Sequence, residues 1–312
     1  MGIARHLLWF LMWALALTTQ VYGVRDRNIT LLESAVAKGA VCLDGTPPAY
    51  IYSKGYGEGA NNWIVYIQGG GWCISWEDCH NRSMSHLGSS TRMMAVYTYY
   101  PPEMDGMLDD NATYNPRLYF LIFTCSSSLP ISCDESSFMS NIDQEINFKG
   151  KVIYFRGVRI YDAMMEELFL NKGIADAQNV ILTGLANLLP TSCTTRMNPT
   201  LYVSCKPSNI IYFRATFIHT LKSLDNSSSI GYFVHSCYAH GHVFDEKTWT
   251  SSSLARHNVL ANKGIGQAIG DWYFNHSSFQ EIDMQNDLPR NCDVILSQTA
   301  FNQLCMDVLQ HA

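Results

Sequence analysis

The spacing of hydrophobic and polar residues along the chain predicts alternating strands and helices. Residues 63–68 form a near-continuous apolar run that ends at a glycine, which is typical of a sheet strand covered on both faces. Residues 155–172 carry apolar positions at helical spacing, and Gly173 provides a C-terminal stop. Residues 179–184 predict the next strand, and residues 263–274 a further helix. The alternation favours an α/β fold with a mostly parallel central sheet.

The apolar positions of the two helices define the faces that we expect to be buried. In 155–172 they are Val158, Tyr161, Ala163, Met164, Leu168 and Leu170. In 263–274 they are Ile265, Ala268, Ile269, Trp272 and Tyr273. Two segments fit the pattern badly. Residues 118–132, rich in Phe, Leu and Ser, are interpreted as an inserted segment, and residues 184–213 leave a strand without a clear helix after it.

The N-terminus has the features of a secretory signal. Arg5 and His6 precede an apolar run at 7–17, and a small residue, Gly23, stands at the end of the cleavage region. A run this short, followed by polar sequence, favours a cleaved signal at 1–23 over a membrane span. No linker or internal repeat divides the remainder, so we expect a single domain over 24–312, with no membrane attachment after cleavage.

Cysteines, sequons and charge agree with a secreted protein. Ten cysteines in a secreted chain imply disulfides, and Cys73 and Cys79 are close enough in sequence to close the loop beside a glycine-rich turn. No C-x-x-C pair occurs, so we expect no metal site. Sequons that indicate a glycoprotein stand at Asn28, Asn81, Asn111, Asn226 and Asn275. A net charge of −6 without a basic stripe argues against nucleic acid as a partner.

The glycine-rich turn is the first candidate for chemistry. Gly70, Gly71 and Trp72 come directly after the strand predicted at 63–68. Consecutive glycines let the backbone approach a substrate closely and direct N–H groups toward one point. Hydrolases use such a turn as an oxyanion hole, which stabilises the charge that develops on a carbonyl oxygen. An ordinary tight turn after a core strand has the same composition, and the residues alone leave both interpretations open.

The second candidate is a histidine after a strand. Residues 231–240 predict a strand followed by a loop that carries His240, with His242 two residues beyond. In α/β-hydrolases the base comes last along the chain, after the nucleophile and the acid. The residues alone do not choose between the two histidines, and a structural role for either is the alternative.

A nucleophile is missing from the sequence. No G-x-S-x-G occurs, and the strand at 179–184 continues into Leu185, Ala186 and Asn187, where an elbow needs a serine between small residues. Asn187 cannot act as a nucleophile, and Ser192 and Cys193 lack the small-residue frame. No Asp or Glu lies between 184 and 213. Asp225 has the right chain order for the acid, but its neighbours predict a glycosylated loop.

Several unusual segments resemble the plant pectin acetylesterases, relatives of the animal Notum carboxylesterases. The matching stretches occur in family order from near residue 30 to near residue 292. They are residues 40–50 (AVCLDGTPPAY), 67–73 (IQGGGWC), 81–83, 87–90 (LGSS), 133–134, 155–157 (FRG), 236–240 (SCYAH) and 270–274 (GDWYF).

The resemblance implies an α/β/α hydrolase-like sandwich and a carboxylic ester hydrolase of the extracellular cell wall. Its implied partner is acetylated pectin (homogalacturonan), from which the family removes acetyl esters, so the implied process is cell wall organisation. It also implies that Gly70, Gly71 and Trp72 line the oxyanion hole and that His240, rather than His242, is the base. We expect no cofactor and a monomer.

The resemblance also locates three departures from the family pattern. The family strand matching 179–184 continues into a G-C-S-A-G-G elbow, whereas here Leu185 follows Gly184. The acid-bearing block has no counterpart before Ser204, and Glu135 replaces the glycine of the family Cys-Asp-Gly. We therefore predict that the nucleophile and the acid, with the elements that carry them, are absent, and that the chain is weakly active or inactive. The alternatives are a non-catalytic cell-wall glycan-binding pseudoenzyme and a non-functional product.

The sharp edges of these departures favour altered splicing or an error in the assigned gene structure over gradual drift. Sequencing of full-length transcripts across the 184–185 junction and across 118–132 tests this interpretation. We expect the dominant transcript to restore a G-x-S-x-G elbow and a later Asp. If the junctions are instead those of the main product, the serine is truly lost, and a secreted pseudoenzyme becomes the hypothesis to test.

Overall fold

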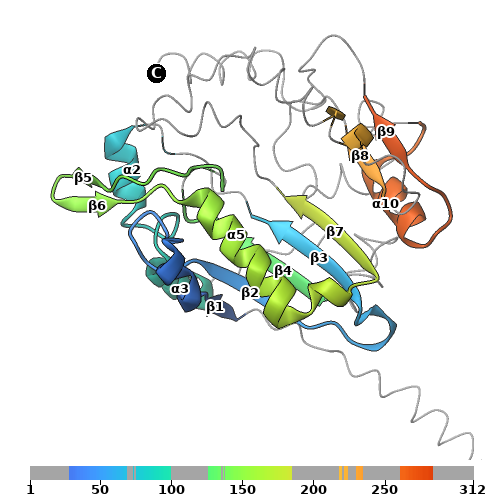
Figure 1. The fold of residues 1–312 in the computed structure, drawn as a ribbon, viewed down its shortest axis with the longest axis horizontal. Coiled ribbons are helices and arrows are strands. Elements are labelled where there is room, and N and C mark those ends of the chain that lie inside the picture. The colour runs from blue at the N-terminus through green and yellow to red at the C-terminus, as the bar shows by residue number, and fades with distance from the viewer. Residues whose placement is uncertain are drawn as a thin grey trace, which may run out of the picture.

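The computed structural model describes residues 28–68, 73, 75–99, 126–134, 136, 138–184, 218–219, 221–223, 230–234 and 261–283. The strands are β1 (Ile29–Leu31), β2 (Ala49–Ser53), β3 (Asn62–Ile67), β4 (Ser126–Ile131), β5 (Ile146–Phe148), β6 (Lys151–Ile153), β7 (Asn179–Gly184), β8 (Tyr232–Val234) and β9 (Gln280–Ile282). The α-helices are α2 (Trp76–Arg82), α3 (Ser90–Tyr99), α5 (Gly157–Glu167) and α10 (Ile265–Tyr273). Short helical turns are η1 (Glu33–Lys38), η2 (Gly57–Gly59), η4 (Leu168–Lys172) and η5 (Ile174–Asp176) (Figure 1).

The central sheet has the order β1-β2-β4-β3-β7. Its β4–β3 and β3–β7 pairs are parallel, while its β1–β2 and β2–β4 pairs are antiparallel. The mixture of helices and strands confirms the α/β class, but the prediction of a mostly parallel sheet is wrong for the described strands. Antiparallel strands at the edge of a parallel sheet are common, because a short connection reverses the chain without a crossover helix. Here η1 and a turn make that connection between β1 and β2.

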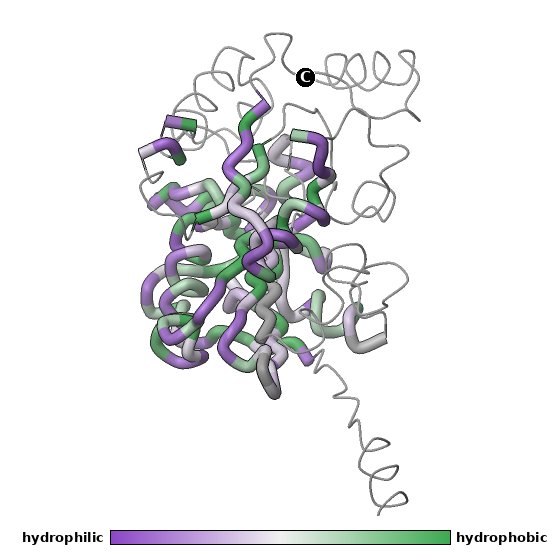
Figure 2. Tube along the Cα trace, turned by 90° about the vertical axis from the view of Figure 1, so that its right-hand side faces the viewer, coloured by the Kyte–Doolittle hydropathy of each residue, from purple (hydrophilic) through white to green (hydrophobic). Residues whose placement is uncertain are grey.

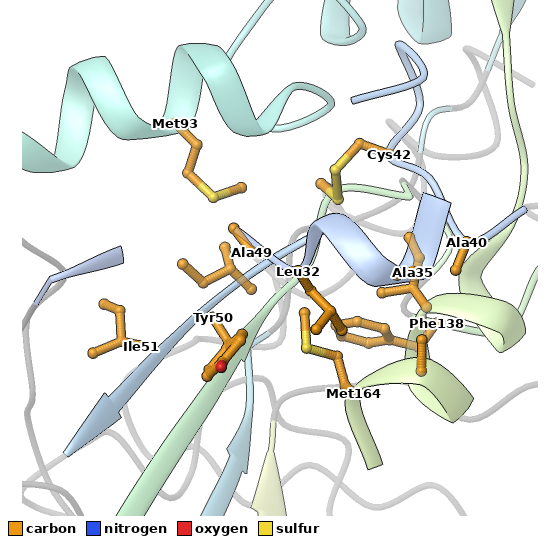
Figure 3. Close-up of a cluster of buried hydrophobic side chains, with 14 of the residues drawn as sticks. Leu32, Ala35, Ala40, Cys42, Ala49, Tyr50, Ile51, Met93, Phe138 and Met164 are labelled. Carbon is orange, nitrogen blue, oxygen red and sulfur yellow. A yellow bond between two sulfur atoms is a disulfide. The ribbon is translucent and has the colours of Figure 1, made fainter. Parts of the chain in front are cut away.

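Helices lie on both faces of this sheet. Successive residues of β2 point to opposite faces. Tyr50 points toward α5, and its Oη donates a hydrogen bond of 3.0 Å to Glu167 at the end of that helix. Figure 3 shows Met93 of α3 beside Ala49, whereas Met164 of α5 lies on the Tyr50 side. The sheet is therefore covered by α5 on one face and by α3 on the other.

Three groups of buried side chains stabilise this arrangement. The largest joins the sheet to α3, α5 and η1, and the partly buried Ile269 and Trp272 of α10 pack against it. A second group includes Trp63 and Val65 of β3 with Leu168 of η4. The third lies around Phe155, away from the centre of the sheet. Figure 2 shows the apolar stretches concentrated within the described body and the hydrophilic ones in its outer loops.

The helix predicted at 155–172 is confirmed, with one side chain misplaced. It begins at Gly157 as α5, continues into the π-helical turn η4 and ends at Gly173, whose φ of 88° is left-handed. Ala163 and Leu168 are buried as expected. Leu170, expected on the buried face, is 72% exposed. A π-helical turn is wider than an α-helical turn, so it moves Leu170 out of the buried row.

The strands predicted at 63–68 and 179–184 and the helix predicted at 263–274 are confirmed as β3, β7 and α10. The interpretation of 118–132 as an inserted segment is wrong for its second half, since residues 126–131 form β4 in the middle of the sheet. Its Ser-rich sequence lacks the alternation typical of a strand. Pairing uses backbone groups, however, and β4 is held by β2 on one side and β3 on the other.

Two of the expected disulfides are present among the described cysteines. Cys42–Cys133 joins positions 91 residues apart, and Cys73–Cys79 joins positions six apart. On the chain-entropy model, closing the longer loop stabilises the fold by about 4–5 kcal/mol and closing the shorter one by about 2 kcal/mol. The long-range disulfide therefore has the larger effect on the fold.

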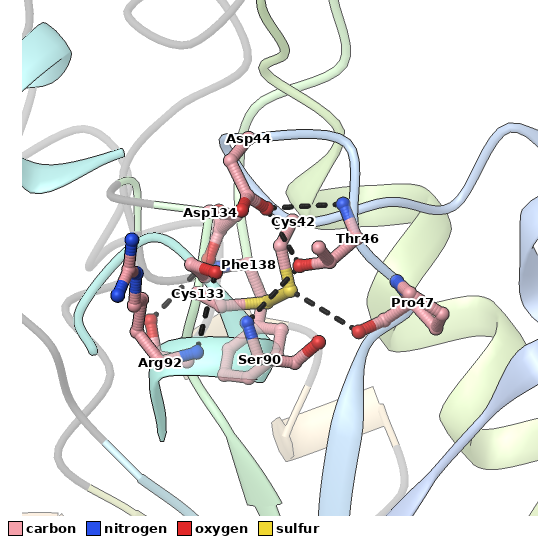
Figure 4. The surroundings of a disulfide bond; sticks show 11 residues. Cys42, Asp44, Thr46, Pro47, Ser90, Arg92, Cys133, Asp134 and Phe138 are labelled. Atoms are coloured by element: carbon pink, nitrogen blue, oxygen red, sulfur yellow. Dashed lines mark hydrogen bonds between the residues drawn. A yellow bond between two sulfur atoms is a disulfide. The ribbon is translucent and has the colours of Figure 1, made fainter. Parts of the chain in front are cut away.

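A buried polar network surrounds Cys133 (Figure 4). The carboxylate of Asp134, which is fully buried, accepts hydrogen bonds from the backbone N–H of Phe138 at 3.0 and 3.2 Å and from the hydroxyl of Ser136. The Oγ of Ser136 accepts in turn from the hydroxyl of Ser140 at 2.6 Å, and the Oγ of Ser140 accepts from the N–H of Gly157 at 3.0 Å. The network thus connects the segment after β4 to the first residue of α5.

Gly157 is the position where this network leaves no room for a side chain. A Cβ at residue 157 would lie 2.7 Å from the Cα of Phe138 and would also collide with the carboxylate of Asp134. We therefore expect Gly157→Ala to lower the free energy of unfolding by about 1–3 kcal/mol, as overpacking of a close-packed site does.

Gly264→Ala is the matched control, because nothing lies within 4 Å of a Cβ there and its φ of −74° suits any residue. It should change the free energy of unfolding by less than about 1 kcal/mol. Chemical denaturation of the two variants, followed by circular dichroism, makes the comparison. Equal stabilities would contradict the close packing at residue 157.

Candidate functional site

The carboxyl ends of β3 and β7 define the edge of the sheet at which the candidate site lies. The two strands are parallel, and their last paired residues are Ile67 and Gly184. Neighbouring strands are about 4.8 Å apart, so the chain leaves the sheet at two adjacent points. Ligands of α/β proteins bind at the carboxyl ends of parallel strands. The glycine-rich turn follows one of these ends, and Leu185, where an elbow was expected, follows the other.

Gln68 stands between β3 and the glycine-rich turn. Its Nε2 donates a hydrogen bond of 3.3 Å to the hydroxyl of Tyr97 in α3. The other amide atom, Oε1, is buried and makes no hydrogen bond. The ring of Tyr97 packs edge-to-face against His86, with centroids 6.4 Å apart. Gln68 therefore brings a polar group to the start of the turn, a position that the sequence analysis did not single out.

The other side of the turn is anchored by a disulfide and a helix. Cys73 is bonded to Cys79 within α2, which confirms the predicted link beside the glycines. Both cysteines are fully buried, in the group that contains Phe155. The N–H of Asp78 donates to Oγ of Ser75, which caps the N-terminus of α2 at 3.1 Å. A strand and a capped helix thus hold the two ends of the turn.

β7 is the edge strand of the described sheet, and one of its faces is open. Val180 and Leu182 lie beside Trp63 and Val65 in the parallel register. The two β3 residues are buried, but Val180 is 42% and Leu182 is 56% exposed. The helical turns η4 and η5 therefore bury this face of β3 but leave the same face of β7 exposed. Exposed apolar residues on an edge strand are unusual in native proteins, because such an edge can pair with another chain.

β8 occupies the strand predicted before His240. It is only three residues long and pairs in parallel with β9. The ring of Phe233 stacks on that of Phe279 with centroids 5.6 Å apart, and Trp272 of α10 lies close to Gly231. In Figure 1 β8, β9 and α10 form one group beside the end of the central sheet.

The predicted site residues themselves lie outside the described part of the chain. These are Gly70, Gly71, Trp72 and His240. The same holds for the alternatives His242, Asn187, Ser192, Cys193 and Asp225, and for the signal at 1–23. The described residues contain no group of three or more His, Cys, Asp or Glu side chains that could hold a metal ion. Within the same ranges no helix has the length and apolar character needed to cross a membrane.

Asp134 is a buried acid that the sequence analysis noted only as part of a motif. It follows β4, whose carboxyl end lies at the same edge of the sheet as that of β3. Burial raises the pKa of its carboxyl group, although the hydrogen bonds from Ser136, Phe138 and Ser132 act in the opposite direction. Its acceptor oxygens are occupied by these donors, and the group is fully buried. Asp134 is therefore a structural residue.

The raised pKa of Asp134 predicts a pH-dependent contribution to stability. The folded chain binds this proton more tightly than the unfolded chain, whose Asp has a pKa of about 3.9. The free energy of unfolding should therefore fall as pH rises from about 4 through the raised pKa. Asp134→Asn, which is isosteric and uncharged, should lose this part of the dependence.

Thermal unfolding of both forms between pH 5 and pH 8 measures the effect, with the pH profile of the Asn variant as the reference. The difference in Tm between the wild type and Asp134→Asn should shift in favour of the wild type at the acidic end. A difference that does not change with pH would contradict a raised pKa at this position.

Comparison with known proteins connects these features to a family of esterases. The chain is 28% identical to pectin acetylesterase 7 of Arabidopsis thaliana, over 86% of this chain and 93% of that protein. It is also 28% identical to pectin acetylesterase 11 of the same plant, over 87% of this chain and 94% of that protein. With the palmitoleoyl-protein carboxylesterase notum1' of Xenopus laevis it shares 29% identity, over 49% of this chain and 29% of that protein.

The chain is shorter than these plant relatives over the region that they share. The alignment with pectin acetylesterase 7 spans 378 positions, whereas 86% of the 312 residues here is about 268, so about 110 aligned positions have no residue in this chain. The pectinacetylesterase family model matches residues 23–187 and 191–293, and the break lies just after β7. The family makes the chain a carboxylic ester hydrolase by descent. The match covers most of the chain, which therefore belongs to the pectinacetylesterase family.

Proposed function

We propose that this is a secreted cell-wall protein whose substrate or ligand is acetylated pectin. It has kept the glycine-rich turn that forms the oxyanion hole of an acetylesterase, and it has lost the nucleophile. Gly70, Gly71 and Trp72 would provide the oxyanion hole and His240 the base. The serine and the aspartate of an intact esterase have no counterpart in the sequence. The expected activity toward acetyl esters of homogalacturonan is therefore weak or absent.

The observation that carries this proposal is the register of β3 and β7. Ile67 is paired with Gly184, so the glycine turn and the residue after β7 start from adjacent points. A nucleophile elbow after β7 would place its serine beside an oxyanion hole after β3, as acyl transfer requires. In this chain Leu185 occupies that position, and the match to the family model is interrupted three residues later.

The exposed face of β7 supports the proposed loss of neighbouring elements. Val180 and Leu182 are exposed although the residues beside them on β3 are buried. The missing aligned positions are enough for several strands and helices of ordinary length. We infer an α/β/α hydrolase-like sandwich from which the elbow and the acid-bearing element are absent.

The remaining groups allow only a slower reaction. In an intact triad the serine attacks the acetyl carbonyl, the histidine takes its proton, and backbone N–H groups stabilise the oxyanion. Without the serine, water is the nucleophile that remains. His240 would accept a proton from that water as it attacks the carbonyl carbon. The tetrahedral intermediate would then expel the sugar oxygen, which takes up the proton, and release acetate.

The anchoring of the turn supports a role for it even without the serine. Preorganised donors stabilise a developing oxyanion because they need no rearrangement during the reaction. β3 and Gln68 hold one end of the turn, and the Cys73–Cys79 disulfide and α2 hold the other. The same anchored turn also favours the second candidate function, binding of acetylated pectin without hydrolysis.

Localisation follows from the sequence and from the relatives. The signal at 1–23, the disulfides among the described cysteines and the sequons are consistent with passage through the secretory pathway, and the names of the plant relatives given above refer to pectin. We therefore place the mature chain, 24–312, in the cell wall as a monomer that needs no cofactor.

The activity of purified chain on acetylated pectin tests the proposal. The value of kcat/KM for acetate release should be about 10⁵–10⁶ lower than that of an intact relative assayed beside it, as when a triad loses its members. His240→Ala should reduce any residual rate by a further factor of about 10²–10⁴, because it removes a general base.

Three further measurements accompany this assay. Disulfide mapping and circular dichroism show whether the chain is folded, which separates an inactive folded protein from a non-functional product. Retention on immobilised acetylated pectin, compared with de-acetylated pectin, tests the binding function. Turnover close to that of the intact relative would overturn the proposal.

A further inference from the structure

The C-terminal end of α10 is closed by a tight turn that places Asn275 in a special backbone conformation. The N–H of His276 donates to the carbonyl of Asp271 at 2.8 Å, and the N–H of Asn275 donates to the carbonyl of Trp272 at 3.0 Å. These are the two hydrogen bonds of a Schellman motif, in which the first residue beyond the helix is left-handed. Asn275 fills that position with a φ of 56°.

Asparagine suits this position because its short polar side chain tolerates the left-handed region better than most residues do. Ile269 of α10 packs against the largest buried group, whereas residues 274–276 of the turn that follows the helix are exposed. Asn275 is exposed, and so is Phe274 before it, at 41%. In Figure 1 the group formed by α10, β8 and β9 lies at the periphery of the described structure.

Asn275 is also the first residue of a sequon, Asn275-His276-Ser277. A glycan is bulky and hydrated, so a folded chain can carry it only where the asparagine is at the surface and its surroundings are open. The Schellman motif meets this need. It holds the backbone of Asn275 by its own N–H, while the exposed side chain is not required for the hydrogen bonds of the cap.

Asn81 is the informative comparison among the described sequons. It is exposed, but it lies inside α2, and the third residue of its sequon, Ser83, is completely buried. The hydroxyl of Ser83 donates to the carbonyl of His80 at 2.7 Å, and Cys79 two residues before Asn81 is in a disulfide. The sequon at Asn275 lies beyond the end of its helix, and its Ser277, whose Oγ accepts a hydrogen bond of 2.7 Å from Nζ of Lys263, is only partly buried.

We propose that Asn275 is an N-glycosylation site of the mature protein. The donor would be an oligosaccharide linked to a polyprenyl diphosphate. The amide nitrogen Nδ2 of Asn275 attacks the anomeric carbon of the first N-acetylglucosamine and loses a proton. A carbon–nitrogen bond forms, the bond from that carbon to the diphosphate oxygen breaks, and the lipid diphosphate leaves. The finished glycan extends from the end of α10 and covers the exposed ring of Phe274.

This inference rests on the proposed passage through the secretory pathway, and its test separates the two. The full chain is expressed in plant cells with its own residues 1–23, and in a second arm with these residues replaced by the leader of a protein that the same cells secrete. N-glycans are released enzymatically in heavy-oxygen water, which labels each formerly glycosylated asparagine as a heavy aspartate. Peptide mass spectrometry then identifies the labelled positions.

Substitutions at the turn separate the glycan from the cap. Asn275→Gly removes the acceptor and keeps the left-handed turn, because glycine is the residue that the Schellman position favours most. We expect it to be secreted in similar amounts and to lose the mass of one oligosaccharide. Ser277→Ala should lose the label at Asn275, and Ser277→Thr, which keeps the sequon, should retain it.

The pattern of labelled asparagines tests the glycosylation site and the signal separately. Label at Asn275 in the wild type and in Ser277→Thr, with its loss in the other two variants, supports the site. Label at Asn28 or Asn81 with none at Asn275 overturns it while leaving secretion intact. Label at Asn275 only with the replaced leader supports the site but counts against residues 1–23 as a signal. An unlabelled Asn275 in both arms overturns the inference.

Discussion

The structure depends most on the link between Cys42 and Cys133 and on the buried carboxylate beside it. The disulfide joins the turn before β2 to the end of β4, across 91 residues. From Asp134 the hydrogen bonds continue through Ser136 and Ser140 to the start of α5. On the other side, Thr46 accepts from the N–H of Ser90 and so connects this turn to α3. Helices on opposite faces of the sheet are therefore tied to one place, and the absence of a Cβ at Gly157 is what lets them approach it.

This arrangement explains why many of the segments that resemble the family serve the fold rather than the reaction. Residues 40–50, 87–90, 133–134 and 155–157 converge on the disulfide and its network, so they serve the fold. The candidate site lies instead at the carboxyl ends of β3 and β7. The loss of an elbow after β7 that we propose would leave the disulfide, the network and α5 in place. Val180 and Leu182, which are exposed at the edge of the sheet, mark the place where we infer that neighbouring elements are missing.

The glycine-rich turn joins these two regions. It begins at a strand of the central sheet and ends at a disulfide buried in a separate apolar group. Gln68 ties its start to Tyr97 of α3. A turn fixed at both ends could keep its shape without a nucleophile beside it, which is why hydrolysis and binding must be measured separately.

The sequence by itself determined which segments form β3, β7 and α10, that the helical segment of α5 and η4 ends at Gly173, that Cys73 and Cys79 are close enough to be linked, and which family the chain belongs to. These features are local, because they follow from periodicity, a left-handed glycine or a few residues of separation. Only the tertiary structure decided that residues 126–131 form a central strand, that Leu170 points to solvent, and that half of the sheet is antiparallel. The pairing of Cys42 with Cys133 and the burial of Asp134 also needed it. Each of these depends on contacts between residues far apart in the chain, which no local pattern of side chains encodes.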